Sequence, residues 1–575
     1  MLVVLPLAGL ALQSADRLSI YLNAGATGAN PLEAARRAWR LTGNYLDEGS
    51  FGPIGRFVEF LVHGLAIEAG DALSLAPHAA LGAVRLAMVG LLAVLAFKLI
   101  ESLQRSAHTH AGRSFIGLYP LALAAALVAN GLGGGLAQVP HTSIGAVAVV
   151  LAVALATSRD RDMAVRPVAW HEYASMAAMG AAAAAFDELA YLAPFVAAAL
   201  LAARSVASGL PPRRALRIAA VRRWAALTAG FAVVFIPARF AIAQSCAADY
   251  ACNDGWILNL GPVAIGAAVA RLGSALPLAG WIANSDRADA AGLDLGFGAV
   301  LANSMLIVAL LVLLALALTA VLRGRHRAAP NDVPNHVTDD VTEDPGPHEQ
   351  HTPRQLRLAL ALGGLGAAIA GASSLYAGLS WWVQQLPFGL AVRQGWRDTL
   401  LAQVGWSLIA AAVLACLDLF LRRRAAHVLK PVAALALAVA AGFTLVANWQ
   451  LAQIDRYDET ASVTTLISAS TVNMGLADSA AGIAELNDWP LRTDGVDYPA
   501  SPSAVRCLLL EVYADREASA PESHIAAEQL RADLNRLTTE RNGVPYCDQA
   551  AEPTAAPAAA PADDSPSTAP EASAS

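Results

Sequence analysis

The stretch RSVASGLPPRRALRIAAVRR, residues 204–223, carries six arginines between two apolar runs that are each long enough to cross a membrane. Short loops rich in Lys and Arg are retained in the cytoplasm during membrane insertion. One apolar run later, Cys246 and Cys252 flank the sequence Ala-Ala-Asp-Tyr-Ala. Two such cysteines pair only in an oxidising compartment. The two signals agree, and they predict a polytopic membrane protein whose residues 204–223 face the cytoplasm.

The composition fits that class along most of the 575 residues. Hydrophobic residues make up 56% of the chain, charged residues only 15%, and the mean hydropathy is +0.48. Apolar runs of about 18 to 25 residues recur, which is the length needed to cross a bilayer. A soluble α-helical protein is therefore excluded, and membrane lipids are expected partners. The net charge is -7, and no basic stripe indicates nucleic acid binding.

Alternate loops between the apolar segments carry clusters of Arg and Lys, and these loops fall on the same side. The first external loop also carries arginines, but long loops are translocated largely regardless of their charge. These are Arg17, Arg36, Arg37, Arg40 and Arg56. We therefore predict an all-α polytopic membrane protein of the plasma (cytoplasmic) membrane, with about 11 transmembrane helices, the N-terminus inside and the C-terminus outside. The first apolar segment lacks a basic n-region and a cleavage site, so it is interpreted as a span and not as a signal peptide. The predicted spans are 1–13, 79–103, 113–135, 142–157, 168–186, 187–204, 223–243, 297–322, 355–378, 400–421 and 431–449.

Two segments within the transmembrane domain, 1–449, are expected to stay outside the bilayer core. The first external loop, 14–77, shows two amphipathic helical patterns, which predict helices on the membrane surface. Glu59, His63 and Glu68 make a span there costly. Residues 324–354 lack apolar periodicity and predict a disordered cytoplasmic linker.

The external regions further along the chain are predicted from their interruptions and patterns. The apolar patch 263–282 is broken by Arg271 and Pro277, which favours a re-entrant or interfacial helix. Residues 450–548 combine strand-like runs with one helical pattern, so they predict a small extracytoplasmic α+β domain. Cys507 and Cys547 are its only cysteines and could be bridged, whereas the remaining cysteine, Cys416, lies inside a span. The Ala-, Pro- and Ser-rich residues 549–575 predict a disordered tail.

Residues that could carry chemistry are the acids and arginines on the predicted outer side. A carboxylate there can act as a base toward an acceptor hydroxyl or position a divalent cation such as Mg or Mn. Guanidinium groups match phosphate oxygens. The combination suits group transfer from a lipid-phosphate donor. The candidate catalytic acids are Asp16, Asp47, Glu48, Asp187 and Glu188, and the candidate phosphate-binding residues are Arg239, Arg393 and Arg397.

Each of these residues also has a simpler interpretation. The Asp187–Glu188 pair fits a polar turn between two helices, and Asp16 fits a marker of the membrane interface. Asp47 and Glu48 precede a glycine and fit a solvated turn. Arg393 and Arg397 flank Trp396 and fit interfacial anchors.

The arrangement resembles a known family. A short first helix followed by Asp16, a long first external loop with the run YLDEGSFGPIGRF at 45–57, many spans and an outer C-terminal domain are similar to GT-C-type, polyprenyl-phosphate-sugar-dependent glycosyltransferases, particularly the glucosyltransferase II-type proteins. The resemblance implies that the catalytic acid is Asp16 or the pair Asp47 and Glu48. It also implies that Gly55–Arg56 is the family's Gly-Arg element, which adds Arg56 to the phosphate-binding candidates. The chain departs from the pattern because Asp16 stands alone and no acid lies in 133–141.

Three functions are therefore carried forward. The first is transfer of a sugar from a polyprenyl-phosphate donor to an envelope glycan or lipid on the outer face. The second is a non-enzymatic scaffold for envelope assembly, which includes a degenerate relative of the transferases, with a partner-binding outer domain. The third is a transporter or flippase, which predicts ionisable groups in mid-membrane and internal repeats. The sequence shows few of the former and no obvious repeat.

Overall fold

The computed structural model describes residues 1–10, 29–47, 49–73, 77–107, 115–131, 135–136, 141–159, 167–215, 217–248, 261–290, 351–386, 388, 395–420, 423–457 and 536. The chain divides into two units, Met1–Val472 and Asn473–Ser575. The second unit contributes only residue 536, so the predicted α+β domain lies almost entirely outside the described residues. The same holds for the tail, for the span at 297–322 and for most of the linker.

All regular elements of the described residues are helices. Those of the first part are η1 (Leu2–Gly9), α2 (Pro31–Asp47), α3 (Pro53–Ala72), α4 (Pro77–Ser106), η3 (Phe115–Leu118), α5 (Tyr119–Ala126), η4 (His141–Gly145), α6 (Ala146–Thr157), α7 (Trp170–Ala184) and η6 (Glu188–Leu192). Those of the second part are α8 (Ala193–Ser208), α9 (Pro212–Ala215), α10 (Ala219–Ala248), α11 (Val263–Ser274), α12 (Pro277–Ala290), α14 (His351–Gly378), α15 (Trp381–Gln385), α17 (Asp398–Phe420) and α18 (Arg423–Tyr457).

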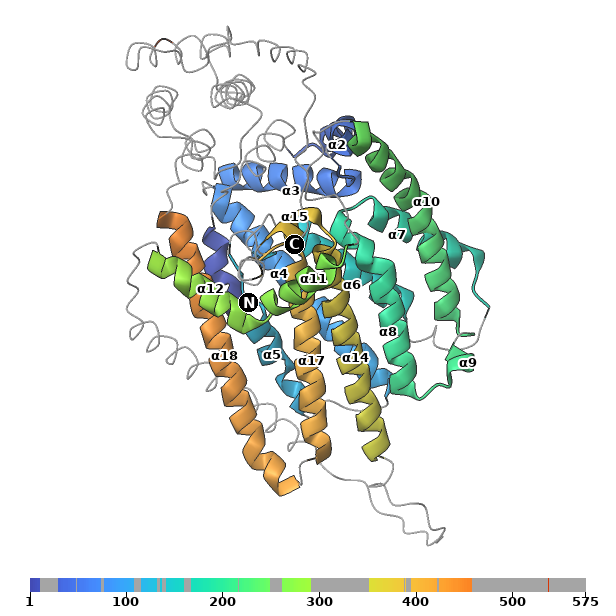
Figure 1. Ribbon diagram of the computed structural model, residues 1–575, viewed down its shortest axis with the longest axis vertical. Helices are drawn as coiled ribbons and strands as arrows, with labels where there is room; N and C mark the ends of the chain where they lie inside the picture. The colour runs from blue at the N-terminus through green and yellow to red at the C-terminus, as the bar shows by residue number, and fades with distance from the viewer. Residues whose placement is uncertain are drawn as a thin grey trace, which may run out of the picture. The chain divides into compact units, whose positions relative to one another are not determined.

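Proline sets the start of several helices. α2, α3, α4 and α12 begin at Pro31, Pro53, Pro77 and Pro277. Proline suits the first helical position because its fixed φ is helical and its missing N–H would have no partner there. Both helices predicted in the first external loop are thus present. α3 runs crosswise to the long helices α14, α17 and α18 at one end of the bundle (Figure 1).

Six helices of the described residues are long and apolar enough to cross a membrane, and each coincides with a predicted span. α11 and α12 form a pair bent by 81°, which would add a seventh if it counts as one span. The bend falls where Arg271 and Pro277 interrupt the apolar patch. The six helices are Ala80–Ser106, Glu188–Ser208, Ala219–Cys246, Arg354–Gly378, Asp398–Leu417 and Leu429–Gln453.

Four other predicted spans are shorter helices in the structure. Segment 1–13 contains the eight-residue 3-10 helix η1, which rises about 16 Å and cannot by itself cross a bilayer core of about 30 Å. Segments 113–135 and 142–157 contain apolar helices of 12 and 15 residues, Phe115–Ala126 and Ser143–Thr157. Segment 168–186 contains the 15-residue α7. In the other direction, α18 continues to Tyr457, beyond the predicted membrane boundary at 449.

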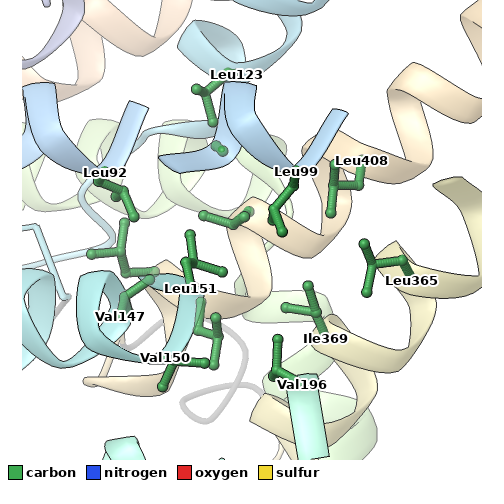
Figure 2. Close-up of a cluster of buried hydrophobic side chains, with 14 of the residues drawn as sticks. Leu92, Leu99, Leu123, Val147, Val150, Leu151, Val196, Leu365, Ile369 and Leu408 are labelled. Atoms are coloured by element: carbon green, nitrogen blue, oxygen red, sulfur yellow. The ribbon is translucent and has the colours of Figure 1, made fainter. Parts of the chain in front are cut away.

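The helices pack around one apolar core. Figure 2 shows leucine, valine and isoleucine side chains from α4, α5, α6, α8, α14 and α17 converging in it. Leu92 and Leu99 of α4, Leu151 of α6 and Leu408 of α17 are fully buried. The predicted spans thus contribute their inner faces to a common centre.

Glycine lets two helix pairs approach closely. A Cβ on Gly366 of α14 would lie 2.6 Å from the carbonyl oxygen of Gly405 of α17, and a Cβ on Gly405 would lie 2.7 Å from that of Gly366. α7 and α10 meet in the same way through Gly180 and Gly230. Small residues at such crossings are typical of helices that associate in lipid.

The arginine-rich stretch 204–223 begins in the last turn of α8, includes the short helix α9 and ends in the first turns of α10. Gly209 ends α8 with a φ of +67°, the left-handed conformation that suits glycine. The two flanking arginines are buried: Arg204 Nε donates to Ser106 Oγ at 3.0 Å, and Arg223 Nη2 donates to the carbonyl of Ala156 at 3.0 Å.

A non-helical segment, residues 127–131, lies buried after α5 and is held by three amide side chains that we call the amide clamp: Asn284 of α12, Gln403 of α17 and Asn448 of α18. Asn448 accepts from the N–H of Ala129 at 2.8 Å and donates to the carbonyl of Leu127 at 3.1 Å. Asn284 and Gln403 donate to the carbonyls of residues 129 and 128 at 2.6 Å each. These bonds replace the helical ones that the segment lacks, which is required of backbone buried away from water.

Candidate functional site

A small polar pocket opens where the start of α3 meets the turn between α7 and η6 and the first turn of α17. We call it the acid–arginine pocket. Its charged side chains come from three parts of the chain that are far apart in sequence. It is lined by Ser50, Gly52, Gly55, Arg56, Glu59, Phe186, Asp187, Glu188 and Arg397.

Two glycines bring the backbone of residues 50–56 against the α7–η6 turn. A Cβ on Gly55 would lie 1.9 Å from the carbonyl oxygen of Phe186, and one on Gly52 would lie 2.8 Å from it. The N–H of Ile54 donates to the carbonyl of Ala185 at 2.9 Å. A larger residue at position 55 would separate the two segments, so this glycine is required by close approach.

The two carboxylates of the turn are held by local hydrogen bonds. Asp187 caps η6, and its Oδ1 accepts from the N–H of Leu189 at 2.9 Å. Glu188 Oε1 accepts from Ser50 Oγ at 2.6 Å and from the N–H of Phe51 at 3.3 Å. The side chains of Asp187 and Glu188 are only 11% and 5% exposed. The pair is therefore built into the interior and is not a solvated polar turn.

A guanidinium lies between these carboxylates. Arg397 Nη1 is 3.7 Å from Asp187 Oδ2 and 3.8 Å from Glu188 Oε2. Both distances are longer than a hydrogen bond. One guanidinium thus forms longer ion pairs with both acids of the turn.

Arg56 supplies the second positive charge of the pocket. Its Nη1 donates to Glu59 Oε2 at 2.9 Å, one helical turn further along α3, and its guanidinium stacks over the ring of Tyr45 at 4.4 Å. Burial lowers the pKa of Arg56, but the charge of Glu59 and of other nearby groups outweighs burial and raises the pKa above its ordinary value. Arg56 is therefore a fixed cation.

The pKa of Asp187 is shifted toward neutrality. Burial is the larger cause and the negative charge of Glu188 the next, and together they raise the pKa of Asp187 to about 7. Arg397 acts in the opposite direction and lowers it. With a pKa of about 7, Asp187 is partly deprotonated near neutral pH, and its carboxylate form can accept a proton as a general base.

The pocket unites four of the residues predicted from sequence: Arg56, Asp187, Glu188 and Arg397. Arg239 lies half-buried on α10 outside the pocket lining. Asp47 ends α2, and its side chain is not among those described. Asp16, Glu48 and Arg393 lie outside the described residues.

Sequence reasoning missed the roles of Ser50 and Glu59. Ser50 stands in the run 45–57 on which the resemblance was based, but nothing in that run predicts its bond to Glu188, 138 positions away. Glu59 stands three residues after Arg56, a spacing that favours an ion pair on a helix and could have indicated it.

The described residues do not test the predicted metal ion or the predicted disulfides. Among them, no group of three or more His, Cys, Asp or Glu side chains is arranged to hold a metal ion, and the Mg or Mn ion stays a prediction. Cys246 lies near the end of α10 and is half-buried. Its predicted partner Cys252, and the predicted pair Cys507 and Cys547, lie outside the described residues. Cys416 of α17 is a free thiol.

No protein family, curated protein or solved structure matches this chain. Its class therefore rests on its own fold and site: a helical membrane protein with an acid–arginine pocket beside a crosswise helix.

Proposed function

We propose that this protein is an integral membrane transferase that moves a sugar from a polyprenyl-phosphate donor to an envelope glycan or lipid. The observation that carries the proposal is the meeting of Asp187 and Glu188 with Arg397 and Arg56 in one pocket. A buried acid pair provides a base, and two guanidinium groups provide a site for a phosphate.

The proposed reaction is a single displacement. One carboxylate of the acid pair takes the proton of an acceptor hydroxyl, and the hydroxyl oxygen forms a bond to the anomeric carbon of the donor sugar. The bond between that carbon and the phosphate oxygen breaks, and its electron pair leaves with the lipid phosphate. Arg397 and Arg56 offset the negative charge that develops on the leaving phosphate.

The proposal includes the predicted sidedness, with the pocket facing the outside of the plasma membrane and the C-terminal domain on the same side. Support comes from the agreement between that sidedness and the contacts in the described residues. Residues 56, 187, 188 and 397 are all predicted to be external, and they line one pocket. Arg204 and Arg223 are predicted to be internal, and so are Ser106 and Ala156, which they contact.

The test uses the purified full chain in detergent and a panel of polyprenyl-phosphate sugars. Binding is followed by thermal shift and turnover by release of the polyprenyl phosphate. One donor should stabilise the parent chain, and Arg397→Met should weaken that binding by about 10- to 100-fold, since it removes a charge-assisted contact of roughly 1.5–3 kcal/mol.

The matched control is Arg36→Gln, which removes an exposed arginine of α2 that is paired with Glu33 outside the pocket. Its binding should equal that of the parent chain. If no donor stabilises the parent chain and none is turned over, the transferase proposal fails. The partner-binding scaffold would then be the better account of the protein.

A further inference from the structure

A buried ion pair lies next to the acid–arginine pocket and includes the residue that follows Arg397. Arg271 of α11 bonds to both carboxylate oxygens of Asp398, the first residue of α17, with Nε 3.3 Å from Oδ2 and Nη2 in contact with Oδ1. The side chains of Arg271 and Asp398 are 1% and 0% exposed. Asp398 follows Arg397 in the chain, so this pair anchors the residue next to a pocket arginine.

Further bonds fix both sides of Arg397. Arg271 Nη2 also donates to Thr399 Oγ1 at 3.0 Å, and the same oxygen accepts from the N–H of Trp396 at 3.0 Å. Ser373 Oγ of α14 donates to the carbonyl of Asp398 at 2.8 Å. The residues before and after Arg397 are therefore tied to one another and to two neighbouring helices.

Arg271 reaches this turn because α11 belongs to the bent helix pair. α11 and α12 are bent by 81°, and Arg271 lies in the last turn of α11 before the bend. The bent pair therefore places the Arg271 guanidinium at the first turn of α17, next to Arg397 of the pocket. The pocket thus depends on residues from outside its own lining.

We infer that Arg271 is a positioning residue: through Asp398 and Thr399 it fixes the first turn of α17, so that the Arg397 guanidinium lies between Asp187 and Glu188. The identity of the pocket's ligand rests on the proposed function, whereas the positioning itself does not. Buried ion pairs often add little to stability and can be replaced by apolar residues without unfolding. Arg271 and Asp398 can therefore be removed together while the fold is retained.

The experiment reads the charge of the pocket without any donor. Ser50, which bonds to Glu188, is replaced by Cys in a chain carrying Cys416→Ser, and this chain is the parent. The rates at which residue 50 is modified by an anionic and by a cationic thiol reagent are measured by mass spectrometry. Arg397→Met should lower the anionic-to-cationic rate ratio by about tenfold, because it removes the positive charge paired with Glu188, to which residue 50 bonds.

The decisive variant is the double substitution Arg271→Met with Asp398→Met, which leaves the net charge unchanged. Displacement of Arg397 should lower the ratio several-fold, in the direction of Arg397→Met. The matched control is Arg223→Met with Glu172→Gln, which removes another opposite-charge pair, 3.9 Å apart, that includes a buried arginine. It should leave the ratio as in the parent.

The inference is overturned if the double variant keeps the parental ratio, if Arg397→Met does not change the ratio, or if the control pair lowers it equally. Thr399→Val gives a second test should the double variant not fold, because it removes the hydroxyl that joins Arg271 to the N–H of Trp396 and leaves the ion pair in place. Displacement of Arg397 would again lower the ratio, with no change in charge. If the chain without any substitution binds no donor, the proposed function is contradicted and these labelling outcomes stand as they are.

Discussion

In the amide clamp, the polar side chains are neutral, and their hydrogen bonds to residues 127–131 are 2.6–3.3 Å long. In the acid–arginine pocket, the side chains are charged, and Arg397 stays 3.7–3.8 Å from the two carboxylates. Both regions bury polar groups within the same helical unit, and both join segments that are far apart in sequence. They differ in whether their polar groups could bind another molecule.

The carbonyls of residues 127–130 all accept a hydrogen bond, so these backbone groups of the clamped segment are satisfied. The pocket holds one close ion pair, Arg56 with Glu59 at 2.9 Å, and a longer contact of Arg397 with Asp187 and Glu188 at 3.7–3.8 Å. Neutral amides satisfy the backbone at little electrostatic cost, whereas charged groups are costly to bury and are typical of functional sites. The difference therefore favours a structural role for the clamp and supports the chemical role proposed for the pocket.

The largest expected effect comes from removing the acids. Asp187→Asn with Glu188→Gln should reduce transfer by about 10²- to 10⁴-fold, because no base remains for the acceptor hydroxyl. The melting temperature should change little, since both amides can still accept the bonds from Leu189 and Ser50. Transfer is measured as release of polyprenyl phosphate. Parental turnover in the double variant would contradict the chemical role proposed for the acid pair.

The next effect concerns the approach of α3 to the α7–η6 turn. Gly55→Val places side-chain atoms where the carbonyl of Phe186 lies, so it should push Arg56 away from the acid pair and abolish donor binding. Gly43→Ala is the control, because a Cβ there meets nothing within 4 Å. Binding by thermal shift should be lost in the first variant and kept in the second. Equal binding by both would show that the close approach is not needed for the pocket.

A smaller effect is expected in the clamp, on stability instead of activity. Asn448→Leu removes the partner of the Ala129 N–H and the Leu127 carbonyl, which should cost about 1–3 kcal/mol. Gln453→Leu, at a half-buried amide on the same helix, should cost less. Unfolding by denaturing detergent measures both. The opposite result, lost donor binding with unchanged stability in Asn448→Leu, would contradict the structural role given to the clamp.

Much of the fold could be predicted from the sequence because lipid imposes a simple rule on it. Apolar length alone located the six long helices, and the interruptions at Arg271 and Pro277 located the bent pair. The shorter helices could not be predicted in this way. α5, for example, ends at Ala126 although the chain stays apolar to residue 129, because side chains of α12, α17 and α18 hold the following residues in a non-helical form.

The site could be predicted in part for a similar reason. Predicted sidedness put Arg56, Asp187, Glu188 and Arg397 on one face, and the structure brings these four together. Sidedness cannot select among the other external acids and arginines, because it carries no distance. The anchoring of Arg397 by Arg271 was also beyond the sequence, since an arginine within an apolar patch indicates a break in a span but not the partner it finds.

The smallest effect is a pH dependence, and its sign follows from Asp187. The pKa of Asp187 is raised by burial and by Glu188 to about 7, above that of a carboxyl in the unfolded chain, which is about 4. Between these values the folded chain keeps a proton that the unfolded chain has lost, so stability should fall as pH rises from about 4 to about 7. Asp187→Asn should flatten this slope, whereas Glu33→Gln, which removes an exposed carboxylate, should not. Melting temperatures across that range test it, and an unchanged slope in Asp187→Asn would mean that Asp187 titrates as a solvated carboxyl does, against its burial in the pocket.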